Sequence, residues 1–132
     1  MKTISIIVVN ENKTFRNTLK HILEEMYEMS QISAVSNIDE LVLIPNYFCT
    51  DIIVLDLMMP EIVGISFAKK IIDTYTDLQI IAISHYNDSI YYENIKEAGF
   101  VDCIYKENII YEIGYKIDNA IKNKKKIHIK IA

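Results

Sequence analysis

The 132-residue chain has few of the residues that interrupt regular structure, with only three glycines and two prolines. A turn-rich β protein needs many more of both, and a disordered chain carries fewer apolar residues than the 51% found in this sequence. A domain near this length buries roughly two-thirds of the surface that its unfolded chain exposes. The composition therefore predicts one folded domain with a self-sufficient core.

Cysteine pairs, excess positive charge and long apolar runs are also missing. Cys49 and Cys103 form neither a disulfide framework nor a metal-binding spacing, so each is expected to be a buried or half-buried apolar residue. The formal net charge of −4 disfavours direct binding of nucleic acid. No segment is apolar for long enough to span a bilayer, and the N-terminus does not resemble a signal peptide. We therefore expect a soluble, cytoplasmic protein that does not bind membranes.

The most informative stretch runs from Ile52 to Pro60. Four apolar residues lead directly into Asp56, and Pro60 comes before the next helical pattern. An unbroken apolar run is typical of a strand that is covered on both faces, as in a parallel sheet flanked by helices. Such sheets bind ligands beyond the carboxyl ends of their strands, where Asp56 is expected to lie. From this stretch alone, Asp56 is either a site residue or a helix cap or loop residue.

Strand and helix patterns alternate along the rest of the chain. We expect buried strands over residues 3–9, 32–35, 52–56, 79–83 and 102–105. We expect helices over residues 13–29, 38–43, 65–75, 88–98 and 109–121, with Gly64 in a preceding loop and Gly99 as a C′ residue. The expected helix caps are Asn12, Asn37, Asn87 or Asp88, and Asn108, and the expected apolar face of the last helix is Ile110, Ile113, Ile117, Ala120 and Ile121. This alternation predicts the α/β class, with a doubly wound parallel sheet of five strands between two layers of helices.

The last residues differ in character from the rest. We expect residues 1–123 to form the domain and residues 124–132 to form a basic tail or the start of a linker. Isoleucines alternate with polar residues in this segment, which contains several lysines. A solvated linker, or a segment that continues in a longer protein, is favoured over an extra strand that pairs in an oligomer.

Polar residues stand at the ends of four expected strands. They are Asn10 with Glu11, Asp56, Ser84 and Lys106. In one parallel sheet these ends share an edge, and carboxylates placed together repel unless a cation joins them. Mg²⁺ takes one or two carboxylates with waters and a phosphate oxygen, and a hydroxyl and an ammonium suit a phosphoryl group. Asp56 is thus a candidate nucleophile that forms an acyl phosphate, although each residue alone has an ordinary structural explanation.

At this point the chain resembles the response-regulator receiver domains of two-component signalling, from Thr3 to about Asn123. The resemblance implies a flavodoxin-like fold with strand order 2-1-3-4-5. It also implies that a histidine kinase phosphorylates Asp56, with Ser84 as the switch hydroxyl and Lys106 as the partner of the phosphate. The implied Mg²⁺ ligands are Glu11, Asp56 and the backbone carbonyl of Met58, and the implied glycine of the following loop is Gly64.

Several positions depart from the family pattern. Asn10 and Glu11 stand where the family usually has two aspartates, so we expect Asn10 to be a weakened metal ligand that acts through water. Cys103 stands where the family has its switch aromatic residue, and Tyr86 or Tyr105 are the conceivable substitutes. Lys106 is followed by Glu107 rather than proline, which removes the usual reason for a cis peptide. Lys106-Glu107 and the pattern of the last helix are most similar to receivers that carry a LuxR-type output domain.

Three functions are compared. The first is a phosphorylation switch whose partners are a sensor histidine kinase and a downstream output protein or C-terminal DNA-binding domain, with homodimerisation through the surface of residues 88–121. The second is a pseudo-receiver that works as an interaction module without phosphorylation, which Asn10 and Cys103 favour. The third, a metabolic enzyme, is disfavoured because phosphatases of haloacid-dehalogenase type need a second aspartate where this chain has Met58. His85, beside Ser84, either lines the mouth of the pocket or is an exposed loop residue, and the exposed position is favoured.

Overall fold

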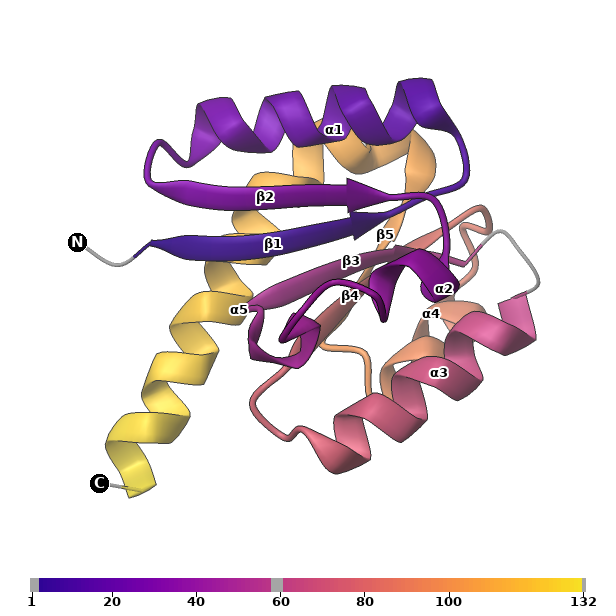
Figure 1. Cartoon of the computed structure of the whole chain (residues 1–132). Coiled ribbons are helices and arrows are strands. Elements are labelled where there is room, and N and C mark those ends of the chain that lie inside the picture. Colours follow the sequence, from indigo (N-terminus) through magenta and orange to yellow (C-terminus); the bar gives the residue numbers. More distant parts are fainter. Residues whose placement is uncertain (1–2, 58–60, 132) are drawn as a thin grey trace.

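The strands of the computed structural model form one parallel sheet. The structure describes residues 3–57 and 61–131, with side chains described for all of these except residues 61–62 and 125–131. The strand order is β2-β1-β3-β4-β5, which is the predicted order. The strands are β1 (Ile4–Val9), β2 (Ser30–Val35), β3 (Ile52–Asp56), β4 (Gln79–Ser84) and β5 (Asp102–Tyr105). In Figure 1, β1 and β2 run toward the right-hand side of the molecule, and each strand is parallel to its neighbours in the sheet.

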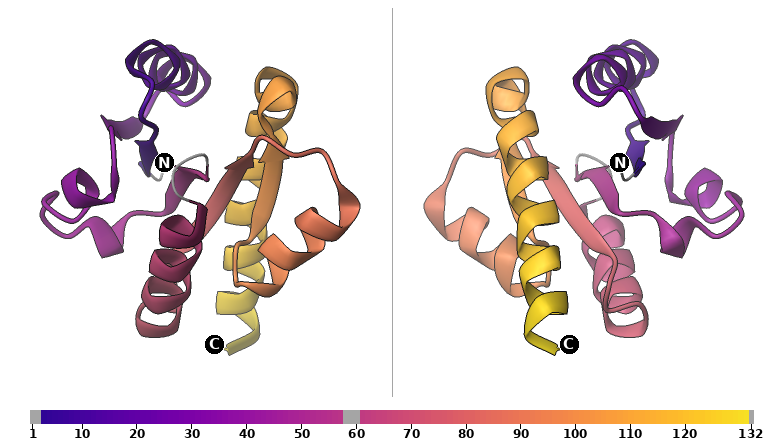
Figure 2. Two further views of the ribbon diagram at one scale, coloured as in Figure 1. Left: turned by 90° about the vertical axis from the view of Figure 1, so that its right-hand side faces the viewer. Right: turned by 90° about the vertical axis from the view of Figure 1, so that its left-hand side faces the viewer.

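Helices cover both faces of the sheet, as the alternating pattern predicted (Figures 1 and 2). The helices are α1 (Lys13–Met26), α2 (Ile38–Leu41), α3 (Glu61–Thr74), α4 (Ser89–Glu97) and α5 (Ile109–Ile131), and two short 3₁₀ turns cover Tyr47–Cys49 and Lys106–Asn108. Successive strand side chains alternate between the faces, so Ile6 and Val8 pack in one core cluster and Ile7 and Val9 in the other. The first cluster includes residues of α1 and α5, and the second includes residues of α2, α3 and α4.

Short polar side chains begin the helices where the sequence predicted them. Asn12 accepts a hydrogen bond from the backbone N–H of Phe15, and Asn37 accepts one from that of Glu40. Asp88, rather than Asn87, caps α4. Each cap also places the end of the preceding strand next to the start of a helix.

The prediction for α1 was too long. The helix ends at Met26, and Tyr27 adopts an extended conformation instead of continuing it to Met29. The Tyr27 hydroxyl donates to Asp118 of α5 at 2.8 Å, and the ring packs against the core cluster below α1. This tertiary contact ends a helix that the apolar spacing alone would extend.

The predicted loop around Gly64 was wrong, because Gly64 lies inside α3. A Cβ atom at this position would meet the Leu57 side chain at 2.9 Å and the Leu55 side chain at 3.7 Å. Glycine is therefore present because the helix approaches β3 closely, and not because the chain turns there. Packing, rather than backbone conformation, explains this residue.

The start of α5 also differs from the prediction. Asn108 belongs to the 3₁₀ turn and not to a cap, and Ile109 is buried where Ile110 was expected. Ile110 is 67% exposed, whereas Ile113, Ile117 and Ala120 are buried as predicted. The extra turn after β5 shifts the first residue of the apolar face by one position.

The helix α5 continues through Ile131, so the backbone of the segment expected as a tail is helical and is not a strand. Its last turns point away from the sheet in Figure 1. The division of the chain at residue 123 stays a prediction. Among the described residues, none of the helices has the length and apolar character needed to cross a membrane.

Candidate functional site

Asp56 is the last residue of β3, the central strand of the sheet. Its neighbour Leu55 pairs with Val9 of β1, and Asp56 itself pairs with Ile83 of β4. The four apolar residues before it are buried, and the side chain of Asp56 is only 6% exposed. The apolar run therefore drives β3 into the middle of the fold and leaves one carboxylate at its carboxyl end. This is the placement that the sequence predicted.

Asn10 lies directly beside Asp56. It follows β1, is 3% exposed, and its side-chain amide donates to Asp56 Oδ2 at 2.5 Å. The Asn10 side-chain oxygen accepts the backbone N–H of Asn12 at 2.8 Å. The Asn10 backbone N–H donates to the Val35 carbonyl, and the Asn10 carbonyl accepts from the Arg16 guanidinium. Asn10 is thus held in place by bonds from its amide and from its backbone.

His85 also contacts Asp56, which the sequence analysis did not favour. Its Nε2 atom lies 3.2 Å from Asp56 Oδ1, and the imidazole is 23% exposed. His85 donates to Asp56 Oδ1 in this contact when Nε2 carries a proton. The preference for an exposed loop histidine was therefore wrong. The available signal was its position directly after a strand-end residue at the edge that carries Asp56.

Glu11 and Lys106 line the same cleft as Asn10 and Asp56. The cleft has a volume of about 540 Å³ and also includes Gly64. Glu11 is exposed, and the Lys106 ammonium lies 4.7 Å from the centre of the Phe15 ring. The fold thus brings three charged groups into one cleft. They are the carboxylate of Glu11 after β1, the carboxylate of Asp56 at the end of β3 and the ammonium of Lys106 after β5.

Ser84 is placed differently. It ends β4 and is 1% exposed, but its hydroxyl accepts the backbone N–H of Tyr86 and donates to the Tyr86 carbonyl, each at 2.9 Å. The hydroxyl therefore closes the turn that follows β4. The structure places Ser84 at the predicted edge with its hydroxyl engaged in that turn.

The oxygen atoms of Glu11 and Asp56 are the donor type that Mg²⁺ prefers, and two carboxylates suffice when waters complete the coordination. Asn10 directs its amide nitrogen, which cannot coordinate a cation, toward Asp56. The described residues contain no group of three His, Cys, Asp or Glu arranged to hold a metal. The predicted ligand Met58 lies outside the described residues. The donor set therefore fits Mg²⁺ with two carboxylates rather than three.

Cys103 occupies the position where the resemblance implies an aromatic switch residue. It is buried in the sheet at 4% exposure, and burial raises the pKa of its thiol to about 11. Tyr86 is 61% exposed, and its ring centre lies 5.1 Å from that of Tyr91. Tyr105 is half-buried at the end of β5. The peptide between Lys106 and Glu107 is trans, as expected without proline.

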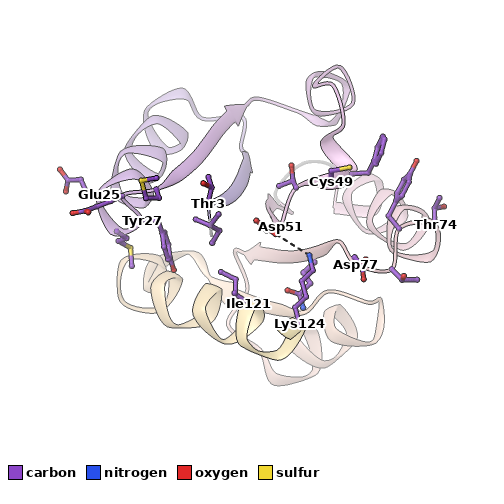
Figure 3. A pocket seen from close by; sticks show the side chains of 18 residues that line it. Thr3, Glu25, Tyr27, Cys49, Asp51, Thr74, Asp77, Ile121 and Lys124 are labelled. Atoms are coloured by element: carbon purple, nitrogen blue, oxygen red, sulfur yellow. Dashed lines mark ion pairs between the residues drawn. The ribbon is translucent and has the colours of Figure 1, made fainter. Parts of the chain in front are cut away.

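A larger cavity lies at the opposite edge of the sheet, where the strands begin. It has a volume of about 1060 Å³, and Tyr27, Cys49 and Ile121 are among the residues that line it. Figure 3 shows an ion pair across it between Asp51 and Lys124, whose atoms are 3.8 Å apart. None of the predicted site residues lines this cavity, so its size does not make it the candidate site.

The model of the response regulator receiver domain family matches residues 6–118 of the chain. The chain belongs to this family. Among curated relatives, this receiver domain is 23% identical over 104 residues to the transcriptional regulatory protein DegU of Brevibacillus brevis, covering 79% of the chain and 44% of DegU. It is 23% identical over 103 residues to the probable C4-dicarboxylate response regulator DctR of Halalkalibacterium halodurans, covering 78% of the chain and 45% of DctR. The receiver domain therefore spans less than half the length of these relatives.

Solved receiver structures share the fold. The signal receiver domain of a DNA-binding response regulator from Colwellia psychrerythraea has a TM-score of 0.80 at 21% identity, covering 90% of this chain and 98% of that one. A LuxR-family DNA-binding response regulator from Staphylococcus aureus has a TM-score of 0.74 at 19% identity, covering 89% of this chain and 98% of that one. At these identities the likeness establishes the flavodoxin-like receiver fold and does not assign roles to individual residues.

Proposed function

We propose that this receiver domain accepts a phosphoryl group on Asp56 from a sensor histidine kinase. The observation that carries the proposal is the placement of a nearly buried carboxylate at the end of the central strand, in one cleft with Glu11 and Lys106. An acceptor needs a positioned nucleophile, a site for a divalent cation and a positive charge near the transferred group. These three groups come from β3, from the loop after β1 and from the turn after β5.

In the proposed reaction, an oxygen of Asp56 attacks the phosphorus atom of a phosphohistidine. The new bond is phosphorus to oxygen, the bond from phosphorus to the imidazole nitrogen breaks, and its electron pair stays on that nitrogen. Bound Mg²⁺, held by Glu11 and Asp56, would neutralise charge on the phosphoryl oxygens. The Lys106 ammonium lies in the same cleft and can pair with a phosphoryl oxygen after leaving the Phe15 ring. The domain acts as a switch and catalyses at most its own phosphorylation and dephosphorylation.

The proposed output is a change in the surface formed by α4, β5 and α5. Relatives of this chain are more than twice as long as the matched segment, and one of them is named a transcriptional regulatory protein. A downstream output protein or a C-terminal DNA-binding domain is therefore the proposed recipient of the signal, and the domain itself is proposed not to bind nucleic acid. A homodimer through the same surface is a second proposed assembly, and a cytoplasmic location is proposed with the kinase partner.

A pseudo-receiver is the alternative function. Asn10 donates to Asp56 in place of a second acidic residue, Cys103 replaces an aromatic ring, and the Ser84 hydroxyl is engaged in its own turn. Such a domain would bind its partner in one conformation whether or not a phosphodonor is present.

Incubation with acetyl phosphate and Mg²⁺, followed by intact-mass measurement, separates the two functions. We expect the mass of one phosphoryl group to be added to the wild type and to Asp73→Asn, which changes an exposed aspartate of α3. Asp56→Asn is expected to remain unmodified. Absence of the adduct from the folded wild type, or its presence on the Asp56 variant, would count against phosphorylation of Asp56 and favour the pseudo-receiver.

A further inference from the structure

We propose that the larger cavity, at the edge of the sheet where the strands begin, binds an organic cation, namely an amine attached to an apolar or aromatic body. Its volume of about 1060 Å³ is comparable to that of the largest small-molecule pockets. The cavity lies at the opposite end of the strands from Asp56. Binding there would be independent of the phosphorylation proposed for Asp56.

The anion of the proposed site is Asp51, which directly precedes β3. Its Oδ2 atom accepts hydrogen bonds from the Ser5 backbone N–H at 2.9 Å and from the Ser5 hydroxyl at 3.2 Å. The Asp51 backbone N–H donates to the carbonyl and the hydroxyl of Ser5. The other carboxylate oxygen, Oδ1, is directed toward Lys124 across the cavity (Figure 3). Ser5 therefore fixes the carboxylate in a position in which Oδ1 can meet a ligand.

The contact between Lys124 and Asp51 is one that a ligand can replace. Lys124 Nζ lies 3.8 Å from Oδ1, which is longer than the roughly 2.7–2.9 Å of a charge-assisted hydrogen bond. The two side chains are 24% and 38% exposed, and exposed ion pairs contribute little to stability. An ammonium group that donates directly to Oδ1 would exchange a weak contact for a stronger one, while the Lys124 ammonium turns to water.

The described side chains give the cavity an excess of negative charge. Glu25, Glu28 and Asp77 line it together with Asp51, and Lys124 is the one basic residue among the described side chains of the lining. Glu28 and Asp77 form no hydrogen bond or ion pair through their carboxylates with another described residue. In Figure 3, Glu25 and Asp77 lie on opposite sides of Asp51. This arrangement attracts a cation and disfavours an anion.

The walls of the cavity suit an aromatic body. Phe48 and Tyr75 stack with their ring centres 4.6 Å apart, and Tyr27 also lines the cavity. Met26 and Met29 line it as well and are 47% and 55% exposed, so a ligand would cover apolar surface that now faces water. Thioethers and aromatic rings pack well against a flat apolar group, and aromatic rings also attract an ammonium group.

A buried acceptor in the same wall lacks a donor. Gln79 begins β4, pairs with the residue that follows Asp51, and lines the cavity. Its side-chain oxygen is buried and has no hydrogen-bond partner among the described residues, whereas most buried polar atoms have one. An N–H group of the ligand would supply this bond once the Gln79 amide turns toward the cavity. A carboxylate ligand would offer no donor.

The test uses three indole compounds of similar size that differ in charge. Tryptamine carries an ammonium group, tryptophol a neutral hydroxyl and indole-3-acetate a carboxylate. Each is titrated into the wild type while the backbone amide resonances are followed by NMR. The size of the shifts gives the affinity, and the residues that shift give the place of binding.

Four variants are compared with the wild type, and circular dichroism confirms that each is folded. Asp51→Asn removes the anion but keeps an oxygen that can accept from Ser5. Asp73→Asn is its matched control, since it makes the same change of charge at an exposed residue of α3 that does not line the cavity. Lys124→Ala removes the competing cation. The double variant Glu28→Gln/Asp77→Asn lowers the negative charge without touching the contact between Asp51 and Ser5.

We expect tryptamine to shift the resonances of residues around Asp51 and to bind about tenfold more tightly than tryptophol, the factor that corresponds to one hydrogen bond to a charged group. Indole-3-acetate should bind more weakly than both. Asp51→Asn should lose about the same factor for tryptamine, and Asp73→Asn should match the wild type. The double variant should bind tryptamine about two- to fivefold more weakly, and Lys124→Ala about two- to fivefold more tightly.

Equal affinity for the three compounds, or no saturable shift around Asp51 at millimolar tryptamine, would overturn the amine site. So would a loss of affinity in Asp73→Asn as large as that in Asp51→Asn or in the double variant. These outcomes leave phosphorylation of Asp56 untouched, because the reaction with acetyl phosphate tests it separately.

Discussion

Asn10 sets the charge of the cleft around Asp56. An aspartate in its place would give the cleft a third carboxylate, whereas the amide donates a hydrogen bond to Asp56 at 2.5 Å. In the absence of a cation, the amide stabilises an ionised Asp56 that a carboxylate would repel. In the presence of Mg²⁺, the neutral amide supplies one negative charge fewer than an aspartate at this position would. We therefore expect Asn10 to stabilise the metal-free cleft and to lower its affinity for Mg²⁺.

Asn10→Asp should show both effects. At about 4 Å and an effective dielectric of about 20, two like charges repel by about 4 kcal/mol before relaxation, so we expect the metal-free variant to lose about 1–3 kcal/mol of unfolding free energy. We expect Mg²⁺ to bind at least about tenfold more tightly, which is about 1.4 kcal/mol. Urea unfolding with and without Mg²⁺ measures the first effect, and calorimetric titration measures the second.

Asn12→Asp is the matched control for Asn10→Asp. Asn12 is an exposed helix cap in the same turn, and aspartate caps helices equally well. It should change Mg²⁺ affinity much less than Asn10→Asp does. Equal affinities in the wild type and in Asn10→Asp would refute the account of the two-carboxylate site.

At the level of elements, a polar cluster joins β5 to α4 and α5. Asp102 Oδ1 accepts from the Tyr92 hydroxyl at 2.7 Å and from Lys116 at 3.2 Å. Lys116 also donates to the Cys103 carbonyl at 2.9 Å and pairs with Glu112. Burial opposes ionisation of Asp102. Hydrogen bonds from the Tyr92 hydroxyl, the Cys103 backbone N–H and the Lys116 ammonium outweigh this effect and hold the pKa of Asp102 below its usual range. This cluster fixes the relative positions of the elements proposed to transmit the signal.

Tyr92→Phe removes one bond of this cluster. Burial, with a further contribution from the bond to Asp102, raises the pKa of Tyr92 to about 12 in the folded protein, against about 10 when unfolded. The unfolded chain therefore loses the proton first, and the stabilisation is complete below about pH 10 and is lost as the pH rises to about 12. We expect Tyr92→Phe to cost about 1 kcal/mol at neutral pH and progressively less through that interval.

Urea unfolding of the wild type and Tyr92→Phe across this pH range measures the difference. Tyr111→Phe is the control, since Tyr111 is 81% exposed on α5 and should show little effect at any pH. If the stability difference between Tyr92→Phe and the wild type stays constant with pH, the raised pKa of the Tyr92 hydroxyl is contradicted.

The end of α4 depends on Gly99, whose φ of 110° is unfavourable for other residues. A Cβ at Gly99 would also approach the Ile72 side chain to 3.2 Å. We expect Gly99→Ala to lower the unfolding free energy by about 1–2 kcal/mol. Gly114→Ala is the control, because Gly114 lies within α5 and its substituent would meet only the Met26 side chain, which is 47% exposed and can move. Thermal unfolding should show Gly114→Ala at or above wild-type stability, and equal stability of both variants would contradict this comparison.

The sequence predicted most of the fold because apolar runs and helical spacing are local properties. The five strands, their order and the placement of Asp56 at a strand end were confirmed. The position of His85 after a strand end placed it near Asp56, but the contact itself was not favoured, since it depends on the rotamer of one side chain across two strands. The same is true of the Ser84 hydroxyl, whose nearest partner is two residues away in its own turn. Gly64 was assigned to a loop because its close neighbour Leu57 becomes visible only when α3 packs on β3.

At the scale of the whole molecule, large apolar side chains remain exposed on α4 and α5, the two helices next to β5. Ile90, Ile110 and Tyr111 are 71%, 67% and 81% exposed. Exposed apolar groups of this size favour a protein contact when they lie together. Addition of beryllofluoride and Mg²⁺ should therefore increase self-association, measured by sedimentation velocity.

Tyr111→Glu should abolish that association, because a charge would be placed in the contact. Leu43→Glu is the matched control, since Leu43 is 79% exposed next to α2, on the other side of the sheet from α5. Dissociation by Leu43→Glu, or a monomer under every condition, would exclude α4, β5 and α5 as the interface.

The contacts of Asp56 also determine when the site can exist during synthesis. Its partner Asn10 precedes it by 46 residues and His85 follows it by 29. On the ribosome, Asn10 and Asp56 are made well before His85 and Lys106, and the closing strands β4 and β5 are the last to be added. A nascent chain that stops after β3 therefore contains the acceptor without the cation that follows β5. Under the proposed function, we therefore expect the ability to accept a phosphoryl group only after the last strand has joined the sheet, and we expect an incomplete chain not to send the signal.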